Sequence, residues 1–295
     1  MDNRKTPMKF GVVLPSFGEG SDRENVLSTS QTAERLGFEM VWLTDHLALP
    51  KPDAGQFGHI FEAVSTMAYL AGATRRIGLG TSVLVLPQRN PVEIAKQIAT
   101  IDALSGGRIV LAVGTGWSHG EYRNLGYDFH NRGRRLDEAL QVLRTLWNAK
   151  DSISFEGKYY HFEDVRISPQ PTQEGGPPVW VGGSSPAALR RAVLLGDGWH
   201  PNAQSPAALQ EALKTIQPGL NGRDFRVCLR IHLKFDQESL PEKVLHGSSQ
   251  QIGKQILAYQ GAGMTDMAID FDAESLAARL EALERFAGEV MPYFR

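Results

Sequence analysis

Short runs of β-branched and other apolar residues alternate along this chain with longer stretches of helical periodicity. That order predicts parallel strands, each joined to the next by a helical crossover. The expected strands cover residues 9–14, 40–43, 77–86, 109–113, 179–181, 198–201, 226–234 and 267–271. Eight strands is the number that closes a (β/α)8 TIM barrel, and 295 residues leave room for an insertion beyond the usual length of about 250.

Segments of helical periodicity lie between several of these strands, and two of them end at a glycine, Gly37 and Gly106, as helices commonly do. The alternation breaks at about residues 149–176, where SISFEGKYYHF predicts a hairpin and SPQPTQEGGPP predicts a loop. This stretch is too short for a domain, and no repeat or shift in composition marks a boundary elsewhere. We therefore expect a single domain over residues 1–295 that carries an insertion at about 149–176.

The charge balance points to a small-molecule ligand. The chain has 31 Lys and Arg against 33 Asp and Glu, a formal net charge of -2, and no dense basic run. It therefore lacks the electrostatic footprint of proteins that bind nucleic acid or an anionic membrane surface. No uninterrupted apolar stretch of roughly 18 residues occurs, and the first residues lack the apolar core of a signal peptide. Cytoplasmic residence is the expectation that follows.

Cysteine and histidine spacing gives no sign of a metal centre. Cys228 is the only cysteine, which excludes an internal disulfide and a multi-cysteine metal site. Its apolar strand context predicts a small buried residue. None of the eight histidines has the spacing of HExxH or of a comparable motif. We predict that the protein binds no metal.

In a barrel of this kind, chemistry is expected at the carboxyl ends of the strands. Asp45 and His46 follow the second strand and place a carboxylate beside the one side chain that titrates near neutral pH. Neighbouring residues of a strand point to opposite faces, so we expect this pair to lie in a turn and to have different partners. On residue type alone, a turn-forming aspartate and a hydrogen-bonded loop histidine are the simpler interpretation.

The fifth strand ends in GGSSP, which has the character of an anion-binding turn. Gly182 and Gly183 allow close approach to the backbone. Ser185 is a good helix N-cap, and Pro186 suits the first helical turn. The free N–H groups and the positive end of the helix would attract an anion, most naturally a phosphate. The spacing alone fits an ordinary strand-to-helix turn with a serine cap equally well.

Six longer motifs occur between about residues 9 and 201, in the order FGVVLPSFG, AERLGFEMVWLTDHL, RIGLGTSVLVLPQRNPVEIAKQIATIDALSGGRIVLAVGTGW, RGRRLDEALQVLRTLW, FEGKYYHF and PVWVGGSSPAALRRAVLLGDGW. Together they resemble the bacterial luciferase-like monooxygenase superfamily, and within it the branch of oxidoreductases that use the deazaflavin coenzyme F420. The final third of the chain matches only weakly. The resemblance implies a (β/α)8 barrel with an insertion near the barrel mouth, and a homodimer.

The same resemblance implies roles for several residues. It makes His46 a catalytic residue near the reactive face of the cofactor's ring, with Asp45 against the ring system. Ser82 and Val83 match a position where relatives carry a non-proline cis peptide, which forms a bulge behind the ring. The segment expected to hold the phosphate of the cofactor consists of Gly182, Gly183, Ser184 and Ser185.

One departure from the family pattern concerns Trp117. Relatives that dehydrogenate a sugar phosphate have a glutamate directly after the GTG-like turn of the fourth strand, where this chain has Trp117. That puts sugar-phosphate dehydrogenation in doubt. We expect Trp117 to line the substrate pocket, with core packing as the alternative. Nearby polar residues whose usual role is structural are weaker candidates, namely Arg89, His119, Glu121 and Arg132.

The resemblance implies hydride transfer between coenzyme F420 and a small organic substrate that the sequence does not identify. The first alternative is an FMN-dependent monooxygenase of the same superfamily, which would use molecular oxygen and a separate flavin reductase. Both cofactors have a flavin-shaped ring and a phosphate, so the sequence separates them poorly. A non-catalytic flavin-binding protein on this barrel is the second alternative. An aldolase or isomerase fits less well, since no Lys or Glu base stands at a strand end beside the phosphate turn.

Overall fold

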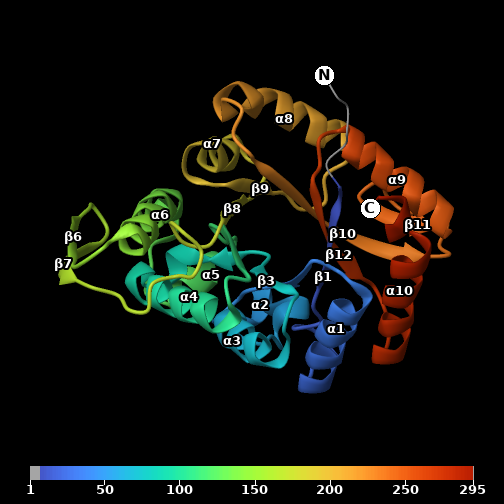
Figure 1. The fold of residues 1–295 in the computed structure, drawn as a ribbon, viewed down its shortest axis with the longest axis horizontal. Helices are drawn as coiled ribbons and strands as arrows, with labels where there is room; N and C mark the ends of the chain where they lie inside the picture. Colours follow the sequence, from blue (N-terminus) through green and yellow to red (C-terminus); the bar gives the residue numbers. More distant parts are fainter. Residues whose placement is uncertain (1–6, 295) are drawn as a thin grey trace.

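Eight parallel strands close into a barrel in the computed structural model, which describes residues 7–294 (Figure 1). In order around the barrel the strands are β1 (Lys9–Val13), β2 (Met40–Leu43), β3 (Gly78–Thr81), β5 (Ile109–Gly114), β8 (Val179–Gly182), β9 (Gly198–His200), β10 (Arg226–Phe235) and β12 (Asp266–Phe271). The pairing of β10 with β9 on one side and β12 on the other closes the ring. The (β/α)8 fold expected from the sequence is confirmed.

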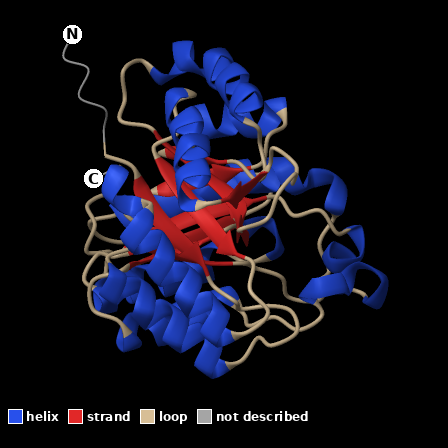
Figure 2. Cartoon of the chain, turned by 90° about the vertical axis from the view of Figure 1, so that its right-hand side faces the viewer, coloured by secondary structure: helices blue, strands red, loops and turns tan. Residues whose placement is uncertain are grey.

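Helices surround the strands (Figure 2). They are α1 (Arg23–Leu36), α2 (Lys51–Ala54), α3 (Ala63–Ala73), α4 (Pro91–Ser105), α5 (His119–Asn124), α6 (Arg132–Asn148), α7 (Pro186–Leu195), α8 (Pro206–Leu220), α9 (Ser249–Gly261) and α10 (Leu276–Glu289). The shorter 3-10 helices are η1 (Gly55–Phe57), η2 (Leu86–Gln88), η3 (Phe129–Asn131) and η4 (Met291–Tyr293). As predicted, α1 and α4 end at Gly37 and Gly106, whose φ values of 81° and 73° are left-handed.

Two strands depart from the predicted pattern. The strand expected over residues 77–86 is interrupted by a cis peptide between Ser82 and Val83, after which β4 (Leu84–Val85) resumes the pairing with β5. The register against β5 shifts by one residue between β3 and β4, so the extra residue forms a β-bulge. A further strand that the alternation does not predict, β11 (Val244–Gly247), pairs with the end of β10.

The stretch at 149–176 contains an antiparallel hairpin of β6 (Ile153–Glu156) and β7 (His161–Val165), which lies beside α6 at the outer edge of the molecule (Figure 1). The Glu138 carboxylate of α6 accepts hydrogen bonds from the three consecutive N–H groups of residues 158–160, at 2.7 to 3.0 Å. The helix α6 follows β5 in the chain, and Glu138 lies in the first half of α6. These hydrogen bonds therefore hold the hairpin turn near the N-terminal half of α6.

The barrel interior is filled by two tryptophans that face glycines. Trp42 of β2 and Trp180 of β8 are buried, with ring centroids 5.4 Å apart. A Cβ on Gly80 would lie 2.3 Å from the ring of Trp42, and one on Gly198 would lie 2.7 Å from that of Trp180. Cys228 lies in the same cluster and is fully buried, as predicted. Aromatic bulk from two strands therefore takes the volume that glycines on neighbouring strands leave free.

Adding one methyl group at this interface should destabilise the barrel. We expect Gly80→Ala to lower the free energy of unfolding by about 1 to 3 kcal/mol, because the rigid Trp42 ring cannot move without disturbing the interior packing. The matched control is Gly72→Ala in α3, where a Cβ meets nothing within 4 Å and should stabilise the helix by up to about 1 kcal/mol. Urea unfolding of both variants measures the difference, and equal stabilities would contradict this account of the interior.

Candidate active site at the barrel mouth

The bulge after β3 places the Val83 side chain between two glycines, Gly114 and Gly182, at the carboxyl ends of β5 and β8. A Cβ on Gly114 would lie 2.5 Å from Val83 Cγ2, and one on Gly182 would lie 2.8 Å from Cγ1. Neither strand could therefore carry a side chain at this level while Val83 keeps its position. Val83 is half-buried, so part of its surface remains open at the mouth. The cis peptide that the family resemblance implies is present at Ser82–Val83.

A neutral histidine supports the bulge from inside the barrel. Ser82 Oγ lies 2.8 Å from Nε2 of His200, and the His200 ring stacks on Trp42 with centroids 5.2 Å apart. Burial, and then the positive charge of Arg230, lower the pKa of His200 to about 3. His200 is therefore uncharged near neutral pH, and its hydrogen bond with Ser82 joins two neutral groups.

Arg230 of β10 connects three strand ends beneath the mouth. Its guanidinium donates to Thr44 Oγ1 at 3.0 Å and to the Ser82 carbonyl at 2.8 Å, and it pairs with Asp270 of β12 at 3.3 Å. The Arg230 side chain is 13% exposed. Neither Arg230 nor His200 is among the predicted site residues. An arginine inside the apolar run RVCLRIHL is the sequence signal that could have indicated the former.

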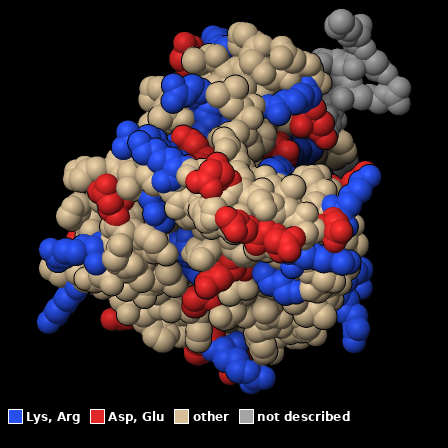
Figure 3. All heavy atoms as spheres, turned by 90° about the vertical axis from the view of Figure 1, so that its left-hand side faces the viewer, with Lys and Arg blue, Asp and Glu red and all other residues tan. Residues whose placement is uncertain are grey.

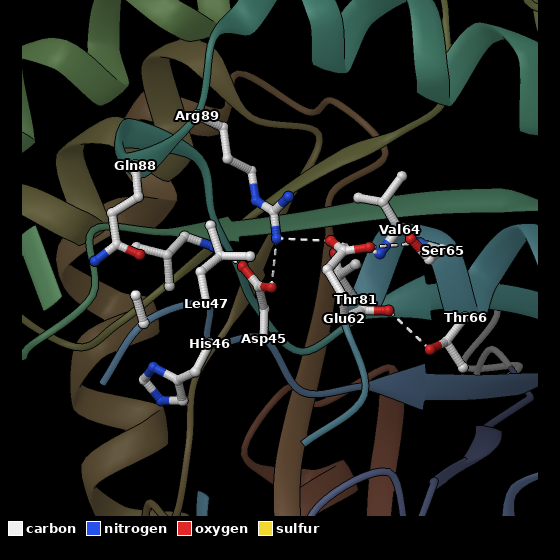
Figure 4. A network of polar contacts seen from close by, with 12 residues as sticks. Asp45, His46, Leu47, Glu62, Val64, Ser65, Thr66, Thr81, Gln88 and Arg89 are labelled. Carbon is white, nitrogen blue, oxygen red and sulfur yellow. Dashed lines mark hydrogen bonds and ion pairs between the residues drawn. The ribbon is translucent and has the colours of Figure 1, made fainter. Parts of the chain in front are cut away.

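The carboxylate of Asp45 is engaged behind the bulge rather than exposed at the mouth. It accepts hydrogen bonds from the Val85 N–H at 2.9 Å and from Arg89 at 2.7 Å, and its side chain is 0% exposed. Arg89 also pairs with Glu62, the N-cap of α3, at 2.8 Å (Figure 4). Burial alone would lower the pKa of Arg89, but the two carboxylates raise it, so Arg89 stays charged.

His46 points away from Asp45 and has a separate set of partners (Figure 4). Its Nδ1 lies 3.0 Å from a carboxylate oxygen of Glu121, and both side chains are almost completely buried. The His46 ring also contacts Phe57 and Trp117, with centroid distances of 4.9 and 5.6 Å. As predicted, the adjacent Asp45 and His46 have different partners, but both lie in the irregular loop after β2 rather than in a defined turn. Trp117 is 53% exposed, which excludes the core-packing alternative for it.

The GGSSP turn presents backbone donors to solvent at the start of α7. Gly183 has a φ of 98°, and its carbonyl accepts a hydrogen bond from Trp199 Nε1 at 2.7 Å. Ser185 caps α7 by accepting from the Ala188 N–H at 3.2 Å. Residues 183–187 are exposed, and among the described residues no group accepts from the N–H of Ser184 or Ser185. These donors and the positive end of the helix can therefore receive an anion.

A cavity of about 630 Å³ lies among the segments that follow β1, β10 and β12. One side carries a charged cluster in which Asp272 contacts His232 at 2.8 Å and Lys234 at 3.3 Å. The hydrogen bond from His232 to Asp272 raises the pKa of the imidazole. Ligand atoms of His232, Asp270 and Asp272 lie within 4.8 Å of one another, but Lys234 and Arg230 already supply cations to these carboxylates. The absence of a metal stays a prediction.

Protonation of His200 should weaken the fold in acid. The pKa of His200 is about 3 in the folded chain against an ordinary 6.5, so the unfolded chain binds the proton more readily between these values. The stability that neutral His200 contributes is present above pH 6.5 and is lost as the pH falls toward 3. Between about pH 6 and pH 4 we expect the free energy of unfolding to fall more steeply than in His200→Phe, by about 1.4 kcal/mol per pH unit. Urea unfolding measures both slopes, and parallel slopes would refute the prediction.

The distribution of charged side chains on the surface agrees with the near-neutral net charge of the sequence. Figure 3 shows basic and acidic side chains interspersed over the face that it presents. Within residues 7–294, no helix is both long and apolar enough to cross a membrane.

The relatives found by comparison with known proteins include F420-dependent and FMNH2-dependent enzymes. An F420-dependent glucose-6-phosphate dehydrogenase of Microbacterium testaceum is 35% identical over 221 residues, which cover 73% of this chain and 63% of that protein. An FMNH2-dependent dimethylsulfone monooxygenase of Pseudomonas putida is 32% identical over 225 residues, which cover 72% of this chain and 60% of that protein. The chain thus spans less than two thirds of the length of either relative.

Solved structures share the fold at low identity. The monooxygenase RslO1 from Streptomyces bottropensis superposes with a TM-score of 0.85 at 19% identity, covering 98% of this chain and 100% of that chain. An F420-dependent secondary alcohol dehydrogenase in complex with an F420-acetone adduct gives 0.83 at 19% identity, covering 98% and 99%. The model of the luciferase-like monooxygenase family matches residues 8–240, most of the chain. The family resemblance is therefore confirmed, and this protein belongs to the luciferase-like monooxygenase family.

Proposed function

We propose that this protein is an oxidoreductase that transfers a hydride between the deazaflavin coenzyme F420 and a small organic substrate. The observation that carries the proposal is the contact of Val83 with Gly182, because it puts a half-buried apolar side chain next to the turn with the exposed backbone donors of Ser184 and Ser185. A flat ring that carries a phosphate on its side chain needs these two features next to each other. The F420-dependent relatives support the choice of cofactor.

The residues at the mouth fit such a cofactor in charge and in shape. The N–H groups of Ser184 and Ser185 and the positive end of α7 would bind its phosphate, and Gly183 leaves the approach to them free of a side chain. Val83 would support the rear face of the ring, and Arg230 would contribute a positive charge below it. When bound, the cofactor supplies the carbon centre that gives or receives the hydride.

His46 would exchange the proton that accompanies the hydride. For a substrate whose oxidation forms a carbonyl, the substrate carbon loses a hydride to the cofactor and its hydroxyl loses a proton to the imidazole; reduction reverses both transfers. Trp117 is half exposed beside His46, so we assign it to the wall of the substrate pocket. Glucose 6-phosphate is not the proposed substrate, because this chain has Trp117 where sugar-phosphate dehydrogenases are expected to have a glutamate.

An FMN-dependent monooxygenase is the second candidate. The similarity to the dimethylsulfone monooxygenase favours it, and the same turn and bulge would accept the ring and phosphate of FMN. That protein would need molecular oxygen and a flavin reductase as a partner. A non-catalytic flavin-binding protein is the remaining alternative, and it would bind a flavin without turnover.

We also propose that the protein acts as a single-domain barrel over residues 1–295, as a homodimer and in the cytoplasm. The family resemblance supports the dimer. The near-neutral charge and the small-molecule site support a role that needs neither nucleic acid nor a membrane. The proposed site residues of one chain come from a single barrel mouth.

Cofactor preference should be visible in binding alone. We expect the purified protein to bind oxidised F420 at least tenfold more tightly than FMN at the same ionic strength, measured by fluorescence titration. Replacing Ser184 by proline removes one backbone donor from the turn and should weaken binding of both cofactors. Preference for FMN would move the assignment to the monooxygenase, and binding of neither would contradict the proposed site.

Loss of His46 should affect turnover more than cofactor binding. We expect His46→Ala to lower turnover by about a hundredfold or more while the Kd for F420 changes little. The assay follows the visible absorbance of the cofactor under anaerobic conditions with a panel of small alcohols, ketones and enones. The matched control is His119→Ala, since His119 is exposed and packs against Phe129 and His130. Wild-type turnover in His46→Ala would refute the role of this histidine.

A further inference from the structure

Glu121 of α5 is a buried carboxylate surrounded by hydrogen-bond donors. Its side chain is 0% exposed. One oxygen accepts from the N–H groups of Leu47 and Ala48 at 2.7 and 3.2 Å. The other lies 3.0 Å from His46 Nδ1 and accepts from Gln88 Nε2 at 3.2 Å. Three N–H donors and one imidazole nitrogen, from two separate segments, therefore meet on this one side chain.

These contacts keep Glu121 ionised. Burial raises the pKa of this carboxyl, but the contact and charge interaction with His46 and the hydrogen bonds from Leu47 and Gln88 outweigh that effect and leave the pKa below its ordinary value. An ionised carboxylate has no proton to donate and can only accept. The hydrogen between Glu121 and His46 must therefore belong to Nδ1 of the imidazole.

The other ring nitrogen of His46, Nε2, is open to the solvent. In a neutral imidazole with the hydrogen on Nδ1, Nε2 carries a lone pair. No described residue bonds His46 Nε2, and this atom is not among the buried polar atoms without a partner, so it reaches an accessible surface. The ring also contacts Phe57 and Trp117, which restrict its rotation.

Within the part of the chain that the structure describes, the charged group in contact with the His46 ring is Glu121. Asp45 precedes His46 in the sequence, but its carboxylate binds Arg89 and the Val85 N–H. The segments packed against the ring contribute Phe57 and Trp117, which carry no charge.

We propose that Glu121 is a positioning residue that fixes the tautomer of His46, so that Nε2 faces the mouth as an acceptor for an O–H or N–H group of a bound ligand. The assignment of a substrate O–H or N–H group as the partner of Nε2 rests on the proposed oxidoreductase function. The tautomer of His46 rests only on its contact with Glu121. A role for Glu121 limited to holding the loop would require its bonds to Leu47 and Ala48 and would leave the His46 tautomer without consequence.

The variant Glu121→Gln separates these two roles. The amide oxygen can keep the two backbone bonds to Leu47 and Ala48, which places the amide NH2 group against His46 Nδ1. A donor at that position forces Nδ1 to accept, and the hydrogen moves to Nε2. The substitution should therefore keep the loop in place and invert the tautomer.

The experiment records the ring-nitrogen chemical shifts of protein labelled with ¹⁵N-histidine, with no cofactor or substrate added. The His46 signals are assigned by their loss in His46→Gln. We expect wild type to show a protonated Nδ1 and a bare Nε2, and Glu121→Gln to show the reverse. The matched control is Glu138→Gln, a carboxylate on α6 that likewise accepts from backbone N–H groups but binds the turn of the outer hairpin, and it should match wild type. A wild-type spectrum with the hydrogen on Nε2 would overturn the proposal even if Glu121→Gln did not fold.

Turnover then tests whether the tautomer matters for the reaction. Glu121→Gln should lower kcat at least tenfold, with the Kd for F420 within about twofold of wild type, and adding it to His46→Ala should cause no further loss. A further loss in the double variant, or unchanged kcat with an inverted tautomer, would overturn the positioning role. If the spectra behave as expected but no hydride transfer is found with wild type, the tautomer assignment stands and the proposed function fails.

Discussion

The structure of the barrel mouth depends on the space that Gly114 and Gly182 leave for the Val83 side chain, because neither glycine has a Cβ. Because a Cβ on either glycine would overlap the valine, the bulge can exist only between strands that lack side chains at this level. The residues on either side are fixed as well, since Ser82 bonds side chains of β9 and β10, and Val85 bonds a carboxylate behind β2. Loss of one such bond leaves a buried polar group unpaired, at a cost of about 1 to 3 kcal/mol.

The two adjacent residues after β2 have different roles: Asp45 is structural, and His46 is the proposed proton acceptor. Asp45 turns inward, where it pairs with Arg89, which also pairs with the N-cap of α3, so these contacts fix the geometry behind the bulge. His46 turns toward the mouth and is held by Glu121. The buried ion pair of Asp45 and Arg89 adds little net stability but fixes the local geometry, because each partner is satisfied. The expectation that Asp45 touches the cofactor stays a prediction, and its carboxylate has protein partners that account for its burial.

The fold could be predicted from the sequence because its signals are local. Alternating apolar runs gave the eight strands, and glycine stops gave the ends of α1 and α4. The site was predicted less completely, because its contacts join distant positions: Ser82 and His200 are 118 residues apart, and His46 and Glu121 are 75 apart. The hydrophobic pattern alone did not show the interruption of the strand at residues 77–86, because the bulge is held by groups on other strands; only the family resemblance indicated it. Family motifs supplied Ser82 and the phosphate turn, but they gave no partner for His46.

A crystal structure of the protein with F420 bound is the most direct measurement of the central claim that the mouth is a cofactor site. The account predicts the deazaflavin ring against Val83, its phosphate within hydrogen-bond distance of the N–H groups of Ser184 and Ser185, and Nε2 of His46 open to the reactive face. A ring bound in the cavity beside Lys234, or a phosphate held away from the start of α7, would contradict it.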